Sequence, residues 1–167
     1  KTALDHSAPI AMRYPRGTGE GVEVEKDIPA LEIGKAEVLF EGGDVVLLAV
    51  GSGVREAIHA RTLLEKDNIQ ATVVNCRFVK PLDQDLILNL AEQIPKLVTI
   101  EENVLQGGFG SAVLECIHNN GRFNCRVKRI GIQDTFVEHG PQAALRSRQG
   151  LDAEAIVQAA LAVIERS

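Results

Sequence analysis

The sequence alternates short apolar runs with segments of helical periodicity, and this alternation limits the possible folds more than any other feature. Residues 44–50 begin with an aspartate, are otherwise continuously apolar, and lie between Gly43 and Gly51. A run of this length is typical of a strand buried on both faces, as in a parallel sheet. Residues 52–66 then place apolar side chains at helical spacing. We therefore expect a βαβ unit to begin here.

The same alternation continues to the end of the chain. It predicts further core strands at residues 70–76, 96–100 and 126–132, and a weaker pattern predicts an edge strand at residues 35–40. Helices are predicted at residues 83–93, 107–119, 141–148 and 152–165, with Ser52, Asp83 and Asp152 as N-terminal caps of their helices. Strands and helices that alternate in this way predict an α/β fold, a three-layer α/β/α sandwich.

The first 28 residues differ from the rest. Residues 9–17 predict a short apolar strand that ends in a turn, and residues 18–27 are polar, acidic and glycine-bearing. That composition suits a linker, so we expect a boundary between residues 18 and 28. The chain starts at Lys1 rather than at a methionine, and we expect it to be part of a longer protein.

Charge and composition argue against several classes of protein. Acidic residues outnumber basic ones by 23 to 18, whereas nucleic-acid binders normally carry a basic excess. The longest uninterrupted apolar run has six residues, and a membrane-spanning helix needs about 20. The three cysteines form no C-x-x-C pair, which is typical of reduced thiols in a cytoplasmic protein. The four histidines lack the spacing of metal ligands.

Open α/β sheets bind ligands beyond the carboxyl ends of their strands, so the residues after each strand are the candidates for a site. Residues 51–55 begin like a dinucleotide-binding fingerprint, but Glu56 stands at the third glycine position, and a tight βα turn is the preferred interpretation. Glu101 and Glu102 follow the core strand at residues 96–100. Because consecutive side chains of a strand point to opposite faces, we do not expect them to form a catalytic pair.

Two further segments each allow a functional and a structural interpretation. The glycines within residues 107–111 could hold an anion at a helix N-terminus, or they could permit close packing of the helix on the sheet, which we prefer. Asp134, Glu138 and His139 could act in acid–base chemistry. No serine or cysteine nucleophile has an obvious partner there, and a structured loop with a surface or interface histidine is preferred.

Arg13 and Arg16 flank Tyr14 and Pro15 near the N-terminus. Proline fixes one backbone angle, and the Gly17 that follows allows the chain to turn sharply. A guanidinium held on such a turn suits bidentate capture of a phosphate or a carboxylate. The residues alone leave this interpretation and that of a solvated arginine at a domain boundary equally open.

Five segments, in this order, resemble the C-terminal part of the transketolase-like, thiamine-diphosphate-dependent synthases. Their sequences are RYPRG (13–17), IGKAEVL (33–39), RFVKPLD (77–83), EENVLQGGFGSAV (101–113) and DTFVEHG (134–140). The KPLD stretch is shared widely with transketolase-like C-terminal domains. The last two segments look particular to the synthases that condense pyruvate with glyceraldehyde 3-phosphate. The resemblance covers nearly the whole chain.

The resemblance implies an activity for the whole enzyme. Pyruvate is joined to glyceraldehyde 3-phosphate with release of CO2, and the product, 1-deoxy-D-xylulose 5-phosphate, feeds isoprenoid, thiamine and pyridoxal synthesis. Thiamine diphosphate supplies the carbanion chemistry, and Mg2+ binds its diphosphate. In the family the metal motif lies in the N-terminal domain and the cofactor-activating glutamate in the middle domain. We therefore expect no catalytic, cofactor-binding or metal-binding residue in this chain, no bound cofactor, and no activity of the chain alone.

The resemblance also implies how the chain is divided. Residues 1–20 would be the tail of the preceding pyrimidine-binding domain, residues 21–30 a linker, and residues 31–167 a transketolase-like C-terminal domain. In the family that domain has a five-stranded, mostly parallel sheet whose first strand is antiparallel. Arg16 matches the arginine that contacts the phosphate of the aldehyde substrate, so it is the one substrate-binding residue that we expect.

Some expectations are less specific. His139 and Glu102 match family positions to which we assign no definite role. The two candidate roles are support of the active-site wall and support of the dimer contact. The implied partners are the missing N-terminal and middle domains, a second copy in a homodimer and the two substrates, with no nucleic acid and no membrane. The implied location is the cytoplasm, with a plastid as the alternative.

Two other hypotheses stay open. One is the last domain of a 2-oxo-acid dehydrogenase β subunit or of a transketolase, and the FVEHG sequence argues against the dehydrogenase. The other is a stand-alone binding or regulatory module that reuses the fold, because a fold alone never settles a function.

Overall fold

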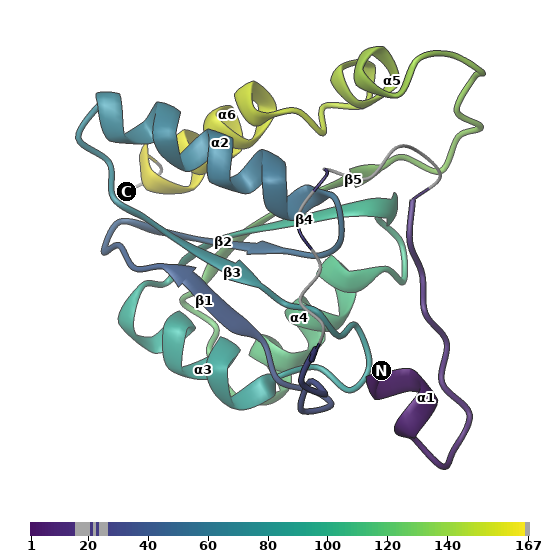
Figure 1. The fold of residues 1–167 in the computed structure, drawn as a ribbon. Coiled ribbons are helices and arrows are strands. Elements are labelled where there is room, and N and C mark those ends of the chain that lie inside the picture. Colours follow the sequence, from purple (N-terminus) through teal and green to yellow (C-terminus); the bar gives the residue numbers. More distant parts are fainter. Residues whose placement is uncertain (16–20, 22, 24–26, 166–167) are drawn as a thin grey trace.

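The computed structural model describes residues 1–15, 21, 23 and 27–165 (Figure 1). Arg16, the predicted substrate-binding residue, lies outside the described residues. In chain order the elements are α1 (Thr2–Asp5), β1 (Glu37–Phe40), β2 (Val45–Ala49), α2 (Gly53–Lys66), β3 (Ala71–Asn75), α3 (Gln84–Gln93), β4 (Lys96–Val104), α4 (Phe109–Asn119), β5 (Arg126–Ile132), α5 (Gln142–Arg148) and α6 (Ala153–Glu165).

The strands form one five-stranded sheet in the order β1-β3-β2-β4-β5. Strand β1 pairs with β3 in the antiparallel direction, and the other neighbouring strands are parallel. Strand β2 lies at the centre, where Leu47 stands opposite Val73 of β3 and Val98 of β4. The predicted five-stranded, mostly parallel sheet with an antiparallel first strand is confirmed.

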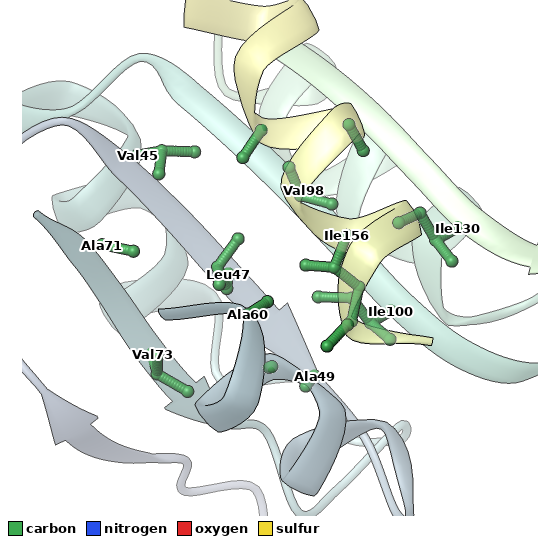
Figure 2. Close-up of a cluster of buried hydrophobic side chains, with 14 of the residues drawn as sticks. Val45, Leu47, Ala49, Ala60, Ala71, Val73, Val98, Ile100, Ile130 and Ile156 are labelled. Atoms are coloured by element: carbon green, nitrogen blue, oxygen red, sulfur yellow. The ribbon is translucent and has the colours of Figure 1, made fainter. Parts of the chain in front are cut away.

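Helices cover both faces of the sheet. Helices α2 and α6 lie on one face, and α3 and α4 on the other (Figure 1). Along β2, Val45, Leu47 and Ala49 point into the core under α2 and α6 (Figure 2), whereas Val46 and Leu48 point into the core over α3 and α4. The continuous apolar run of the sequence therefore reflects burial on both faces, as predicted.

Two of the three predicted helix caps are confirmed. The Asp83 carboxylate accepts a hydrogen bond from Leu86 N at the start of α3, and its second oxygen accepts one from Ala36 N. Asp152 accepts one from Ala155 N at the start of α6. Ser52 makes no side-chain cap, because its backbone is already helical (φ −63°, ψ −20°) and a capping residue needs a non-helical backbone.

The prediction for the N-terminal region was wrong in one respect. Residues 9–15, the described part of the predicted strand, have no regular secondary structure and are exposed. An extended segment becomes a strand only when another strand accepts and donates main-chain hydrogen bonds, and the sheet ends at β1 and β5. Helix α1 was not predicted; the hydroxyl of its Thr2 accepts a hydrogen bond from Leu31 N at 2.7 Å. Across the described residues, no helix combines the length and apolarity needed to cross a bilayer.

Candidate functional site

Strand β4 continues beyond its predicted end at Ile100 to Val104, and its two consecutive glutamates point in opposite directions. Glu101 is 1% exposed, and its carboxylate accepts hydrogen bonds from Phe109 N at 2.7 Å and from Gly110 N at 2.8 Å. Glu102 is partly exposed and instead contacts Arg146 and Arg13. The expectation that the two carboxylates form no pair is confirmed.

Glu101 also decides how the glycine-rich segment is used. Its carboxylate occupies the N-terminus of α4, where the free N–H groups of a helix attract negative charge. A Cβ on Gly108 would lie only 2.3 Å from Glu101 Oε2 and 2.4 Å from the Val104 carbonyl oxygen. The glycine therefore permits close packing, the preferred interpretation, and the anion at this helix end is one of the chain's own side chains.

Glu102 is the centre of the candidate site, at the carboxyl end of the sheet. Arg146 of α5 donates a hydrogen bond from Nε to the Glu102 carboxylate. Arg13, from the N-terminal segment, donates from Nη2 to the main-chain oxygen of Glu102 at 3.0 Å. Strand β4, helix α5 and the N-terminal segment thus meet at Glu102, although Arg13 lies 89 residues before it in the sequence.

The electrostatics of this cluster keep Glu102 ionised. Burial raises the pKa of the Glu102 carboxyl, but the hydrogen bond from Arg146 and the charges of Arg146 and Arg13 outweigh burial, so the pKa lies below its ordinary value. A carboxylate with a lowered pKa is a poor proton donor or acceptor near neutral pH. Glu102 is therefore suited to holding cations in place.

A mainly apolar cavity of about 260 Å3 lies next to the ion pair. Its lining comes from the N-terminal segment, β4, β5, the loop after β5, α5 and the turn before α6, namely Pro15, Glu102, Ile132, Val137, Gln142, Leu145, Arg146, Gln149 and Leu151. A smaller cavity of about 120 Å3 shares Arg146 and is also lined by Arg55, Glu56, Ala143 and Asp152. The Arg146 side chain borders both cavities.

The other predicted site residues are not brought together. Asp134, Glu138 and His139 are exposed on the loop after β5, and Glu138 lies 3.7 Å from Arg148 in an ion pair. From this loop, Val137 lines the larger cavity. The structure therefore supports the interpretation of a structured loop rather than an acid–base cluster.

The tight βα turn after β2 is also supported. Gly51 has a φ of +58°, and a Cβ on Gly53 would lie 2.8 Å from Ile100 Cγ2. The glycines thus serve the turn and the close approach of α2 to β4, and Glu56 pairs with Arg55.

Arg146 is the site residue that sequence reasoning missed. The sequence predicted α5 but gave no reason to prefer one of its arginines. A usable signal was its place in the order of elements, because a short helix that follows the last parallel strand begins near the carboxyl edge, where such sheets bind ligands. The local sequence also gave no indication that Arg13 contacts Glu102.

Residues 34–156 match the family described as "Transketolase, C-terminal domain". The chain is 50% identical over 159 residues to 1-deoxy-D-xylulose-5-phosphate synthase 1 of Geobacter sulfurreducens, which covers 95% of this chain and 25% of that protein. It is 54% identical over 157 residues to synthase 2 of the same organism, with coverage of 93% and 25%. It is 47% identical over 169 residues to the synthase of Heliobacterium modesticaldum, with coverage of 100% and 26%. The chain spans about a quarter of the length of these curated relatives.

Solved structures give the same fold. A structure titled "Split gene transketolase, inactive beta4 tetramer" superposes with a TM-score of 0.76 at 35% identity, over 81% of this chain and 44% of that one. The transketolase of Campylobacter jejuni superposes with a TM-score of 0.56 at 21% identity, over 77% of this chain and 18% of that one. The second likeness concerns the fold alone.

Proposed function

Because the chain belongs to the family of transketolase C-terminal domains, we propose that it forms the C-terminal part of a 1-deoxy-D-xylulose-5-phosphate synthase. The whole enzyme would join pyruvate to glyceraldehyde 3-phosphate with loss of CO2. The observation that carries this proposal is the set of synthases that are 45–54% identical to the chain over 93–100% of its length.

We propose that thiamine diphosphate and Mg2+ bind outside this chain, in the rest of the whole protein. The residues described here do not fit them. Among these residues, no group of three or more histidine, cysteine, aspartate or glutamate side chains could hold a metal ion. The glycine-rich N-terminus of α4, which could have received a diphosphate, is filled by Glu101. The role of this chain is therefore to bind and position rather than to supply the cofactor chemistry.

Within that enzyme, Arg16 would bind the phosphate of the aldehyde substrate. A guanidinium can donate two parallel hydrogen bonds to phosphate oxygens, which fixes the orientation as well as the charge. In this proposal residues 1–20 end the preceding pyrimidine-binding domain, residues 21–30 form a linker, and residues 31–167 form the C-terminal domain.

The proposed assembly is a homodimer that also contains the N-terminal and middle domains. Support comes from large apolar side chains left uncovered in the structure, above all Phe136 (fully exposed) and Phe123 (69% exposed). Exposed aromatic residues are common where proteins meet. The proposed location is the cytoplasm, where free thiols such as those of Cys76, Cys116 and Cys125 persist.

The test compares the full-length protein encoded by the gene with the 167-residue chain. With thiamine diphosphate, Mg2+, pyruvate and glyceraldehyde 3-phosphate, we expect the full-length protein to form 1-deoxy-D-xylulose 5-phosphate. We expect the chain alone to give no product and no heat of thiamine diphosphate binding in calorimetry. An inactive, folded full-length protein, or turnover by the chain alone, would contradict the proposal.

A further inference from the structure

Helix α5 is attached to the rest of the structure differently from the helices that cover the sheet. Each of α2, α3, α4 and α6 has buried residues, whereas α5 has none. Figure 1 shows α5 at the end of the loop that follows β5, apart from α6. Its seven residues are too few for a stable helix on their own, because isolated helices shorter than about 12–15 residues are marginal in water. Contacts outside α5 must therefore keep it folded in place.

The electrostatic contact that joins α5 to the sheet is the ion pair of Arg146 with Glu102. Their side chains are 16% and 30% exposed, so water screens this attraction less than that of a fully exposed pair. A second ion pair of α5, between Arg148 and Glu138 of the preceding loop, has side chains that are 70% and 85% exposed. Exposed pairs contribute little to stability. The Glu102–Arg146 pair is therefore the stronger of the two, and it ties α5 to β4.

The larger cavity lies between α5 and the end of the sheet. One part of its lining comes from the N-terminal segment, β4, β5 and the turn before α6, namely Pro15, Glu102, Ile132 and Leu151. The other part comes from residues 137–149, namely Val137, Gln142, Leu145, Arg146 and Gln149. If residues 137–149 move away from the sheet, one wall of the cavity is lost and the apolar side chains of the other wall meet the solvent.

The two ends of α5 are held differently. At the C-terminal end, Leu151 N donates to the Arg146 oxygen at 2.9 Å and Gly150 N to the Ser147 oxygen at 3.0 Å, the pattern of a Schellman cap. Gly150 has a φ of +66°, and Leu151 is 4% exposed in the core under α2 and α6. At the other end, α5 continues into the exposed residues 133–139. The helix thus has one fixed end and one free end.

We propose that α5 and the loop before it form a lid over the larger cavity, with Gly150 as its hinge and the Glu102–Arg146 ion pair as the clasp that keeps it closed. When the clasp breaks, α5 loses its helical hydrogen bonds, because a helix of this length is not stable alone. The cavity then opens at the carboxyl end of the sheet, where open α/β sheets bind ligands. This inference does not rest on the proposed function, since its contacts all lie among the described residues of this chain.

Hydrogen exchange of the 167-residue chain, followed by mass spectrometry, tests the clasp. The amides of Leu145, Gln149 and Leu151 donate to main-chain oxygens within or next to α5, so their exchange reports on opening. A hydrogen bond between charged groups is lost in both Glu102→Gln and Arg146→Ala, and we expect each substitution to speed this exchange about tenfold. Arg146→Lys, which keeps the charge, should recover part of the protection. The amides of α2 and α6 should exchange as before.

The matched control is Arg148→Ala, which removes an arginine from the same helix and breaks the exposed pair with Glu138. It should leave the exchange of α5 nearly unchanged. Unchanged exchange in the Glu102→Gln and Arg146→Ala chains would overturn the clasp, and so would an equal acceleration in the control. Equal acceleration in α2, α5 and α6 would show that the ion pair supports the whole fold, and would overturn the lid.

A second measurement tests whether opening uncovers the cavity. Ile132→Cys places a thiol in the wall that stays with the sheet. Adding Glu102→Gln to this variant should speed alkylation of the new thiol by iodoacetamide about as much as it speeds the exchange of α5. Cys76, which is 2% exposed in the core over α3 and α4, should react as before. Faster exchange of α5 without faster alkylation would mean that the helix frays and leaves the cavity covered, which would overturn the lid.

Discussion

Glu101 and Glu102, which are adjacent in β4, contact different partners because neighbouring residues of a strand point to opposite faces. Glu101 is buried and serves the fold, since it satisfies two N–H groups at the start of α4. Glu102 is partly exposed and holds Arg146 and Arg13. The alternation was readable from the sequence. The partners were not, because they come from elements that lie far apart along the chain.

The lowered pKa of Glu102 predicts that the contact between Arg13 and Glu102 depends on pH. A carboxyl whose pKa is lowered by such a contact stabilises it above the ordinary pKa, here 4.5, and this stabilisation is lost as the pH falls through the lowered value. Tyr14, the single tyrosine of the chain, is next to Arg13 in the sequence and reports on the contact through its fluorescence anisotropy. We therefore expect the anisotropy of Tyr14 to fall on acidification below about pH 4.5, while circular dichroism still reports a folded chain. In Glu102→Gln the anisotropy should already be low at pH 7 and lack this acid step. The same acid step in both proteins would contradict the assignment to Glu102.

At the scale of elements, the helices and strands were predictable where one short pattern determines them. Strand β2 was readable because Val45–Ala49 is apolar on both faces, and α3 because Asp83 caps it. Residues 9–15 have a similarly apolar start, but none of the strands in the described part of the chain pairs with them. The role of α5 was not readable either, because the partner of Arg146 lies 44 residues earlier in the chain.

The junction between β4 and α4 should tolerate no side chain at Gly108. The added methyl of Gly108→Ala would meet the Glu101 carboxylate at 2.3 Å and the Val104 carbonyl at 2.4 Å, one of them main chain. We expect the free energy of unfolding to fall by about 2 kcal/mol, measured by urea denaturation. Gly43→Ala is the control, because a Cβ there meets nothing within 4 Å. Equal stability of the two variants would contradict the account of this junction.

At the scale of the whole molecule, the chain contains a complete sheet with two cores but, among the described residues, no set that could hold a metal ion. It spans about a quarter of the curated synthases that it matches. The fold and the family were predictable from the sequence, since the strand–helix alternation and the five resembling segments both lie within the chain. How Arg13 and Pro15 reach the site was not, because that contact depends on the tertiary structure.

We propose that Arg16 of this chain binds the substrate phosphate in a 1-deoxy-D-xylulose-5-phosphate synthase. The most direct measurement is steady-state kinetics of the full-length protein and its Arg16→Ala variant with each substrate varied in turn. We predict a KM for glyceraldehyde 3-phosphate that rises by about tenfold or more, and a KM for pyruvate that stays the same, because only the aldehyde carries a phosphate. An equal rise for both substrates, or no change in either, would contradict the claim.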